Sequence, residues 1–451
     1  MNFMKRFRAI LFWTHLGCGL IAGICIAIMC FTGAALAFQG EITAWAERDA
    51  RRVVPPATDA TRLSIDDLSK RLREAEPEIR PSGVVVSSDP RDAVAFTLGR
   101  DGAVYANPYT GEIRRPASTR VNDLLHTLED WHRVLAMGGD HRATGKMING
   151  ACNLAFFILA VTGLYLWFPR SWSWRNAKTN ALFNWKAAGK ARDFNWHNVI
   201  GLWCAPVLIV LTLTAIPMSY RWGADLIYSI AGEPPPARQS GGPGGFSAGS
   251  SVEVPKPAPG TRPLGNAAMI AAAQKAMPAW ETITLRLSAG REAGGGAAGQ
   301  GRRATGKAAA QPLSPDQNAK PVGGVPSPRE TPTATTSSLN ENGENRGGEG
   351  RPTAPAVSIT VREPGSWPRT AITILILNPY TGDILKREGF ADLPASRQIR
   401  TWTRFLHTGQ AVGWIGQLVA GLACLGGCVL AYTGFALAWR RFFGKKKSSA
   451  I

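Results

Sequence analysis

Four long apolar runs divide the chain and predict its architecture. They cover residues 10–38, 147–168, about 197–220 and about 413–439, and none of them contains Asp, Glu, Lys or Arg. A helix of about 20 apolar residues is long enough to cross the roughly 30 Å hydrocarbon core of a membrane. The first run is too long for a signal-peptide core and lacks a small-residue cleavage site, so it predicts a retained span. The hydrophobic pattern therefore predicts four transmembrane helices.

The two long segments between these runs follow one plan, a helix and then strands. Helical patterns begin near Ser64 and Asn266. Strand patterns follow at 84–86, 93–98 and 102–106, and again at 282–287, 356–361 and 370–377. Each unit ends on Asn-Pro-Tyr-Thr-Gly, an acidic residue and Ile, at 107–113 and 378–384. Two copies predict an internal repeat. The motif is typical of a turn, so we assign it no chemistry.

Two stretches of the second unit lack this pattern. Residues 289–355 contain no aromatic residue and are rich in Gly, Pro, Ser, Thr and Asn, and residues 234–260 are similar. Such a composition cannot bury enough apolar surface to fold, so we expect a disordered insertion and a linker.

The charge of the chain is explained by its distribution. Lys and Arg number 51 against 32 Asp and Glu, a net charge of +19. Three flanks of the spans, 1–9, 169–196 and 440–451, hold fourteen of the basic residues and one acidic residue, Asp193. The positive-inside rule places these flanks in the cytoplasm and residues 40–145 and 221–406 outside. We therefore expect no nucleic-acid partner.

The cysteines and the common nucleotide motifs exclude several classes of protein. All seven cysteines lie in the apolar runs, so the outside units have no disulfide framework. There is no Cys-x-x-Cys-His for covalent haem attachment, no Walker motif and no dinucleotide fingerprint.

The scarcest ionisable residue is histidine, and every copy lies near a membrane edge. His15 and His197 lie near the starts of the first and third spans, at similar depth, and the other four lie on the outside: His126, His132, His141 and His407. Two neutral imidazoles from different helices can ligate one haem iron. The alternative is that these are ordinary interfacial histidines.

The spans themselves carry a repeated pattern. His15 and His197 are each followed by Gly-Leu four residues later and by a threonine after 17 residues, Thr32 and Thr214. The second and fourth spans both end on Thr-Gly, at 162–163 and 433–434. The pattern predicts a duplicated pair of spans.

Taken together, these motifs resemble the PepSY-associated transmembrane helix family. The resemblance rests on Trp13-Thr-His15-Leu-Gly, Trp131-His132-Arg133, Asp193-Phe-Asn-Trp-His197, Leu406-His407-Thr-Gly409 and both Asn-Pro-Tyr-Thr-Gly turns. It covers nearly the whole chain. It implies an α-helical membrane protein, a four-helix transmembrane bundle with two periplasmic α+β PepSY-like domains, in a bacterial inner membrane with both termini cytoplasmic.

The resemblance also implies an activity, because some members are similar to ferric-siderophore reductases that carry two b-type haems. The axial histidines would be His15 and His197 for a cytoplasmic-side haem, and most plausibly His132 and His407 for a periplasmic-side haem. His126 and His141 are alternatives, and Arg133 and Arg404 are candidate partners of propionates or of an anionic chelate. A cytoplasmic reductant or quinol would supply electrons to a ferric siderophore or other chelate. The alternative is a non-catalytic membrane protein that binds or regulates a periplasmic partner.

The predicted organisation has ten segments. In chain order they are a cytoplasmic N-terminus at 1–9, a span at 10–38, a first PepSY-like domain at 39–118, a helix and loop with three histidines at 119–146, a span at 147–168, a basic loop at 169–196, a span at 197–220, a second PepSY-like domain at 221–406 with the insertion 289–355, a span at 407–439 and a cytoplasmic tail at 440–451.

Overall fold

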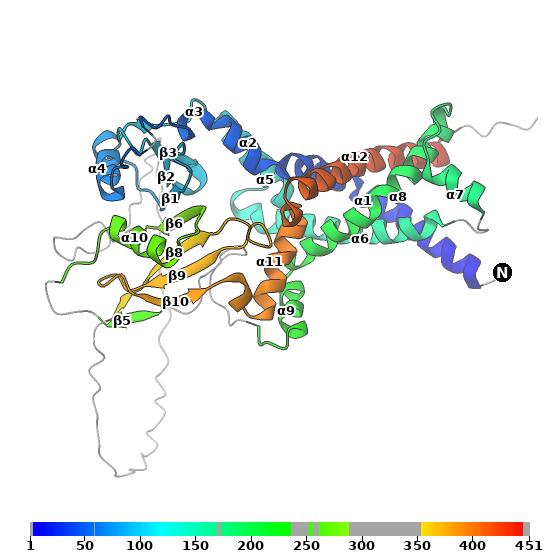
Figure 1. The fold of residues 1–451 in the computed structure, drawn as a ribbon. Helices are drawn as coiled ribbons and strands as arrows, with labels where there is room; N and C mark the ends of the chain where they lie inside the picture. The colour runs from blue at the N-terminus through cyan, green and yellow to red at the C-terminus, as the bar shows by residue number, and fades with distance from the viewer. Residues whose placement is uncertain are drawn as a thin grey trace, which may run out of the picture.

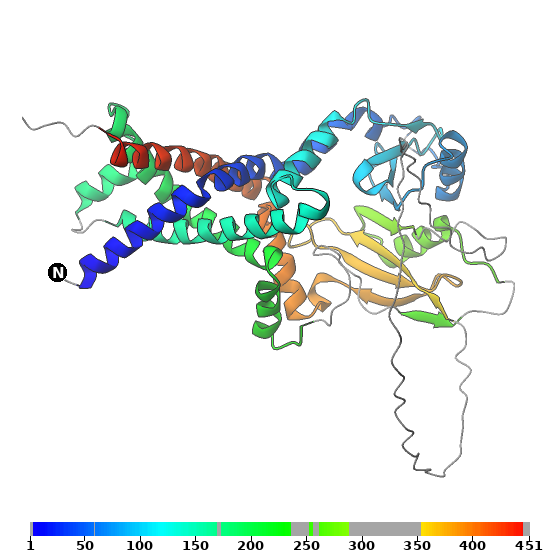
Figure 2. The same cartoon turned by 180° about the vertical axis from the view of Figure 1, so that it is seen from behind.

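The computed structural model describes residues 3–57, 59–168, 173–235, 252–255, 261–287 and 353–444. Figures 1 and 2 show two regions, a bundle of long helices and a β-sheet region beside one end of it. We call that end of the bundle the sheet end. The opposite end, from which α1 starts and at which α12 stops, is called the terminal end.

Four helices are long and apolar enough to cross a membrane, as the sequence predicts. They are α1 (Phe3–Leu36), α6 (Arg142–Trp167), α8 (Gly189–Ser219) and α12 (Trp414–Phe442). In the bundle α1 packs on α6 and α12, and α8 packs on the same two helices. Consequently α1 and α8 face each other across the bundle axis, and so do α6 and α12.

Shorter helices extend the bundle at the sheet end. α5 (Arg120–Val134) leads into α6, and α11 (Ala395–His407) leads into α12. The predicted fourth span of 407–439 therefore includes the last residue of α11 and most of α12. Gly409 and Gly413 lie between these two helices and adopt positive φ, which keeps the helix from being continuous. Four further short helices are α2 (Gln39–Ala46), α3 (Arg48–Arg51), α7 (Trp174–Ala181) and α9 (Arg221–Ile230).

The two repeated units form one antiparallel sheet. Its strands lie in the order β10-β9-β8-β6-β1-β2-β3-β4. The first unit supplies β1 (Gly83–Ser87), β2 (Val94–Thr97), β3 (Ala103–Ala106) and β4 (Ile113–Arg114). The second supplies β6 (Thr282–Arg286), β8 (Val357–Arg362), β9 (Thr373–Leu377) and β10 (Ile384–Glu388). The units meet where β1 pairs with β6.

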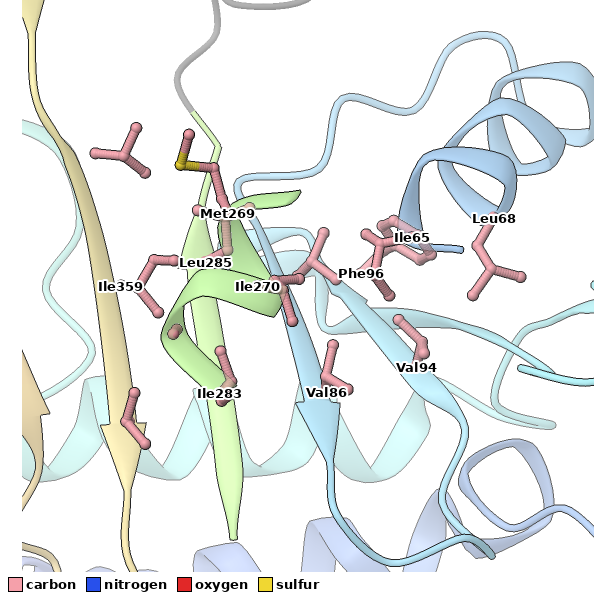
Figure 3. Close-up of a cluster of buried hydrophobic side chains, with 14 of the residues drawn as sticks. Ile65, Leu68, Val86, Val94, Phe96, Met269, Ile270, Ile283, Leu285 and Ile359 are labelled. Carbon is pink, nitrogen blue, oxygen red and sulfur yellow. The ribbon is translucent and has the colours of Figure 1, made fainter. Parts of the chain in front are cut away.

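One hydrophobic core spans both units, which together form a single joined sheet. Helices α4 (Ile65–Ala75) and α10 (Asn266–Ala276) lie on the same face of the sheet, and Figure 3 shows their apolar residues meeting those of the strands. Phe96, Ile283 and Ile359 are completely buried there. Asp66 of α4 accepts hydrogen bonds from the backbone N–H groups of Asn266 and Ala267, which caps the helix of the other unit.

The repeated motifs are turns, as predicted. The side-chain oxygens of Asn107 and Asn378 each accept from the backbone N–H two residues later, at 2.9 Å. Gly111 and Gly382 have φ of +74° and +78°.

One expectation about the irregular segments is wrong in part. β5 (Glu253–Pro255) pairs with β7 (Thr353–Pro355), so both segments predicted to lack structure contribute a short strand. Each strand provides hydrogen-bond partners for the backbone groups of the other strand. The rest of the predicted insertion, 289–352, lies outside the described residues.

Candidate functional site: two facing histidine pairs

Four of the six histidines meet as two pairs across the bundle. His15 of α1 faces His197 of α8 at the terminal end, with ring centres 6.3 Å apart and ring planes at 85°. His132 of α5 faces His407 of α11 at the sheet end, with ring centres 6.2 Å apart and planes at 54°. Each half of the duplicated bundle thus contributes one histidine to each pair.

A threonine on a neighbouring helix anchors every one of these rings. The Nδ1 atoms of His15 and His132 lie 3.0 Å and 2.9 Å from the hydroxyls of Thr162 and Thr32. In the second half the same contact is repeated: Nδ1 of His197 lies 2.9 Å from Thr433 Oγ1, and Nδ1 of His407 lies 3.4 Å from Thr214 Oγ1. The two helices of each half therefore hold each other's histidine.

The hydrogen bonds of the threonines fix the tautomer of the histidines. Each hydroxyl donates its proton to the carbonyl four residues earlier, at 2.6 Å for Thr162, 2.7 Å for Thr32 and Thr214, and 2.8 Å for Thr433. A hydroxyl has one proton, so its oxygen accepts from the imidazole Nδ1–H. Every ring therefore keeps its lone pair on Nε2.

Backbone carbonyls support the same assignment at the sheet end. Nδ1 of His132 lies 3.1 Å from the carbonyl of Met29, and Nδ1 of His407 lies 2.9 Å from that of Leu211. A carbonyl can only accept, so both Nδ1 atoms carry a proton. Burial, and then the proximity of His407, lower the pKa of His132 to about 4, and burial lowers the pKa of His407. Both rings are neutral at neutral pH.

Small residues let the rings lie against the helices. A Cβ added at Gly33 or Gly163 would come within 3.1 Å of Cε1 of His132 or His15. The same position beside His197 is Gly434, where a Cβ would lie 3.6 Å from Cε1. Each glycine follows the anchoring threonine directly, which explains the recurring Thr-Gly.

This arrangement fits a metal held by two axial imidazoles. A metal–imidazole bond is about 2 Å long, and a ring centre lies roughly 1 Å behind its nitrogen, so opposed ligands of one iron have ring centres about 6 Å apart. Among the described residues no group of three or more His, Cys, Asp and Glu could hold a metal ion. A metal held by one such pair would need its remaining ligands from a group that binds with it, as the four nitrogens of a porphyrin supply them.

The other residues predicted for the site lie apart from the ring contacts. His126 lies 3.6 Å from Glu129, and His141 is exposed in a short 3-10 turn, η2 (Gly139–His141). Arg133 donates to Glu129 at 2.6 Å, and Arg404 is exposed on α11. The structure brings together His132 and His407 and leaves the two alternatives outside the pair.

Sequence reasoning missed two features of the site. The first is the set of anchoring threonines, which the sequence presents only as signs of duplication, because the 17-residue spacing joins Thr32 and Thr214 to histidines other than their hydrogen-bond partners. The second feature is Asp193, which is 1% exposed and lies one helical turn before His197. It pairs with Arg192 at 2.9 Å and with Arg440 at 3.0 Å, and so ties α8 to α12 at the terminal end.

The fold defines a multi-pass membrane protein of four apolar helices, in which two pairs of half-buried histidines face each other. The chain belongs to the family described as the PepSY-associated TM region, whose model matches residues 12–441. The search of curated proteins found no match.

Proposed function

We propose that this protein transfers electrons across a membrane by means of two non-covalently bound b-type haems. The observation that carries the proposal is the pair of facing histidine sites, in which every Nδ1 lies within hydrogen-bond distance of a threonine hydroxyl and, among the residues that the structure describes, no hydrogen bond engages an Nε2. A neutral imidazole with its second nitrogen hydrogen-bonded is the usual form of a histidine metal ligand.

Each residue of the site then has a distinct role. His15 and His197 would hold one haem iron, and His132 and His407 the other. Such a haem, when bound, supplies reversible one-electron chemistry at its iron. The threonines hold the rings in one orientation, and the glycines that follow them let the rings lie against the helix backbone. Arg404 is exposed beside the sheet-end pair and could bind a propionate or an anionic chelate, whereas Arg133 already pairs with Glu129.

The packing between the two pairs supports electron transfer without a water-filled path. Along α1, His15 and the anchor Thr32 are 17 residues apart, which is about 25 Å of helix. Phe156 of α6 lies between these levels and packs against two buried apolar clusters, one around Ile26 and Cys30 and one around Leu208. A packed apolar core excludes water and bulk ions but still allows electrons to tunnel.

Substrate and orientation follow from the same proposal. The basic flanks at the terminal end would lie in the cytoplasm of a bacterial inner membrane, where a cytoplasmic reductant or quinol donates electrons. The sheet region would lie in the periplasm, and a ferric siderophore or other ferric chelate is the proposed acceptor. Reduction to Fe(II) weakens the binding of hard oxygen donors and so releases iron for uptake.

The spectrum of the purified protein tests haem binding. We expect a Soret band, with two haems per chain in a pyridine haemochrome assay. His15→Ala and His132→Ala should each leave one haem per chain, and His126→Ala and His141→Ala are matched controls that should leave two. Absence of haem from the wild-type protein after expression with added haem precursor would overturn the proposal.

A second measurement tests the acceptor. Protein reduced with dithionite and freed of excess reductant should be reoxidised by a ferric siderophore, with Fe(II) captured by a colorimetric chelator. Reoxidation should slow at least tenfold in His132→Ala. Haem that is present but not reoxidised by any ferric chelate would retain the cofactor and refute the ferric-reductase activity.

A further inference from the structure

The two histidine pairs differ in one geometric respect. The ring centres are equally far apart, but the ring planes cross at 85° in the terminal-end pair and at 54° in the sheet-end pair. The duplication relates the two rings within each pair, so the two rings of one pair should have matching surroundings. The surroundings of His132 and His407 in the sheet-end pair do not match.

The repeat is broken next to His407. The residue after the anchoring threonine is Gly33, Gly163 and Gly434 in three of the four positions, and it is Ala215 in the fourth. At two of the three glycines an added Cβ would lie 3.1 Å from Cε1 of the histidine, closer than ordinary van der Waals contact. By the same register, the methyl group of Ala215 occupies the place against which the ring of His407 would otherwise lie.

The hydrogen-bond distances of His407 differ from those of the other rings in the direction in which this methyl group would push the ring. Its Nδ1 lies 3.4 Å from Thr214 Oγ1, whereas the other three rings lie 2.9–3.0 Å from their threonines. The same Nδ1 lies 2.9 Å from the carbonyl of Leu211, closer than the 3.1 Å of the matching contact of His132. The ring of His407 has turned away from the threonine and toward the carbonyl.

We propose that Ala215 is a positioning residue that sets the angle between the imidazole planes of the sheet-end pair and so makes the two haem sites electronically distinct. This inference rests on the proposed haem binding. Ala215 acts through His407 and need not touch the iron.

The angle between two axial imidazole planes is visible in the ferric haem itself. Nearly perpendicular planes leave the iron d orbitals close in energy and give a highly anisotropic low-spin EPR signal, whereas planes closer to parallel separate these orbitals and give a more rhombic signal. The wild-type protein should therefore show two low-spin signals of different anisotropy, the larger from the terminal-end pair.

Substitution of Ala215 tests the inference in the full-length protein. Ala215→Gly should shift the less anisotropic signal toward the other, leaving two haems per chain. Ala205→Gly, on the same helix but away from the anchoring threonines, is the control for the helix-weakening effect of glycine, about 1 kcal/mol. Gly163→Ala is the reciprocal variant and should move the terminal-end signal away from the perpendicular form.

The outcomes separate this inference from the proposed function. Two haems per chain with EPR signals unchanged in Ala215→Gly would refute the role of Ala215 and leave haem binding intact. In that case the next candidate source of the ring angle would be Pro217, which lies two residues after Ala215 and lacks the N–H for a backbone hydrogen bond of α8. A wild-type protein without haem would instead refute the proposed function.

Discussion

The helix bundle and the sheet region are both built from a duplicated unit, but the duplication has different consequences in the two. In the sheet region the copies join edge to edge through β1 and β6 and share one apolar core. In the bundle the copies face each other, and each contributes one histidine to each pair. Joining the edges of the two units buries apolar side chains and completes one sheet. Facing halves bring two histidines to one point, which neither half has alone.

This difference implies that the two regions can be perturbed separately. The sheet depends on side chains that are buried between strands and helices, whereas the sites depend on polar contacts between helices of the bundle. A substitution in the sheet core should therefore lower the stability of the sheet without emptying the histidine pairs.

The largest effect is expected in the sheet core, next to the strand that joins the two halves. Phe96 of β2 is completely buried and lies opposite Val84 of β1. Phe96→Ala should lower the free energy of opening of the sheet by about 3–5 kcal/mol, because it removes a large buried side chain and leaves a cavity. Hydrogen–deuterium exchange of the β1 and β6 amides measures this free energy.

The matched control is Thr284→Ala, on the less buried face of β6, which should change exchange by less than about 1 kcal/mol. Haem content should stay at two per chain in both variants. Loss of haem in Phe96→Ala at a temperature where the sheet is folded would show that the histidine sites depend on the sheet. The two regions could then not be perturbed separately.

Much of the bundle could be predicted from the sequence, because the membrane imposes a simple rule of length and apolarity. The joined sheet could not, because the pairing of Val84 with Leu285 connects residues about two hundred positions apart and nothing local encodes it. The choice among the sheet-end histidines depended on the rotation of α5. His132 lies two turns after the buried Leu125 and on the same face, but only the packing shows which face meets the bundle.

The anchoring threonines show a different limit. The spacing of 17 residues to Thr32 and Thr214 was visible, but the partner of each threonine lies on another helix, so the hydrogen bond required the packing of α5 on α1 and of α11 on α8. The Ala215 exception was also visible as a departure from Thr-Gly. Its consequence for the ring angle appears only in the structure.

An intermediate effect is expected from the anchors themselves. Thr433→Val keeps the volume of the side chain but removes the acceptor for Nδ1–H of His197. Loss of such a support for a metal-binding histidine typically weakens metal binding ten- to a hundredfold. Titration of haem into the apoprotein should show this loss at the terminal-end pair alone, and Thr433→Ser, which keeps the hydroxyl, should bind like the wild type. Equal binding by the valine and serine variants would mean that the threonines do not support the ligands.

The smallest effect compares the two turn glycines, which share a sequence but not their surroundings. Both have positive φ, so alanine at either position should cost roughly 1–2 kcal/mol of sheet stability. A Cβ at Gly111 would also lie 2.5 Å from Arg71, which donates to the carbonyl of Thr110, whereas at Gly382 the nearest atom is 3.3 Å away in Leu264. Gly111→Ala should therefore destabilise the sheet more than Gly382→Ala.

The excess at Gly111 should come from Arg71 alone, which a double-mutant cycle can measure by hydrogen exchange. Once Arg71→Ala has removed the obstructing side chain, adding Gly111→Ala should cost about as much as Gly382→Ala does in the wild-type background. Haem content and both EPR signals should be unchanged throughout, because these turns lie in the sheet region and touch none of the four paired histidines. If the two glycine variants cost the same before Arg71 is removed, then the backbone conformation alone explains the motif, and the two halves of the sheet are more nearly equivalent than the two histidine pairs.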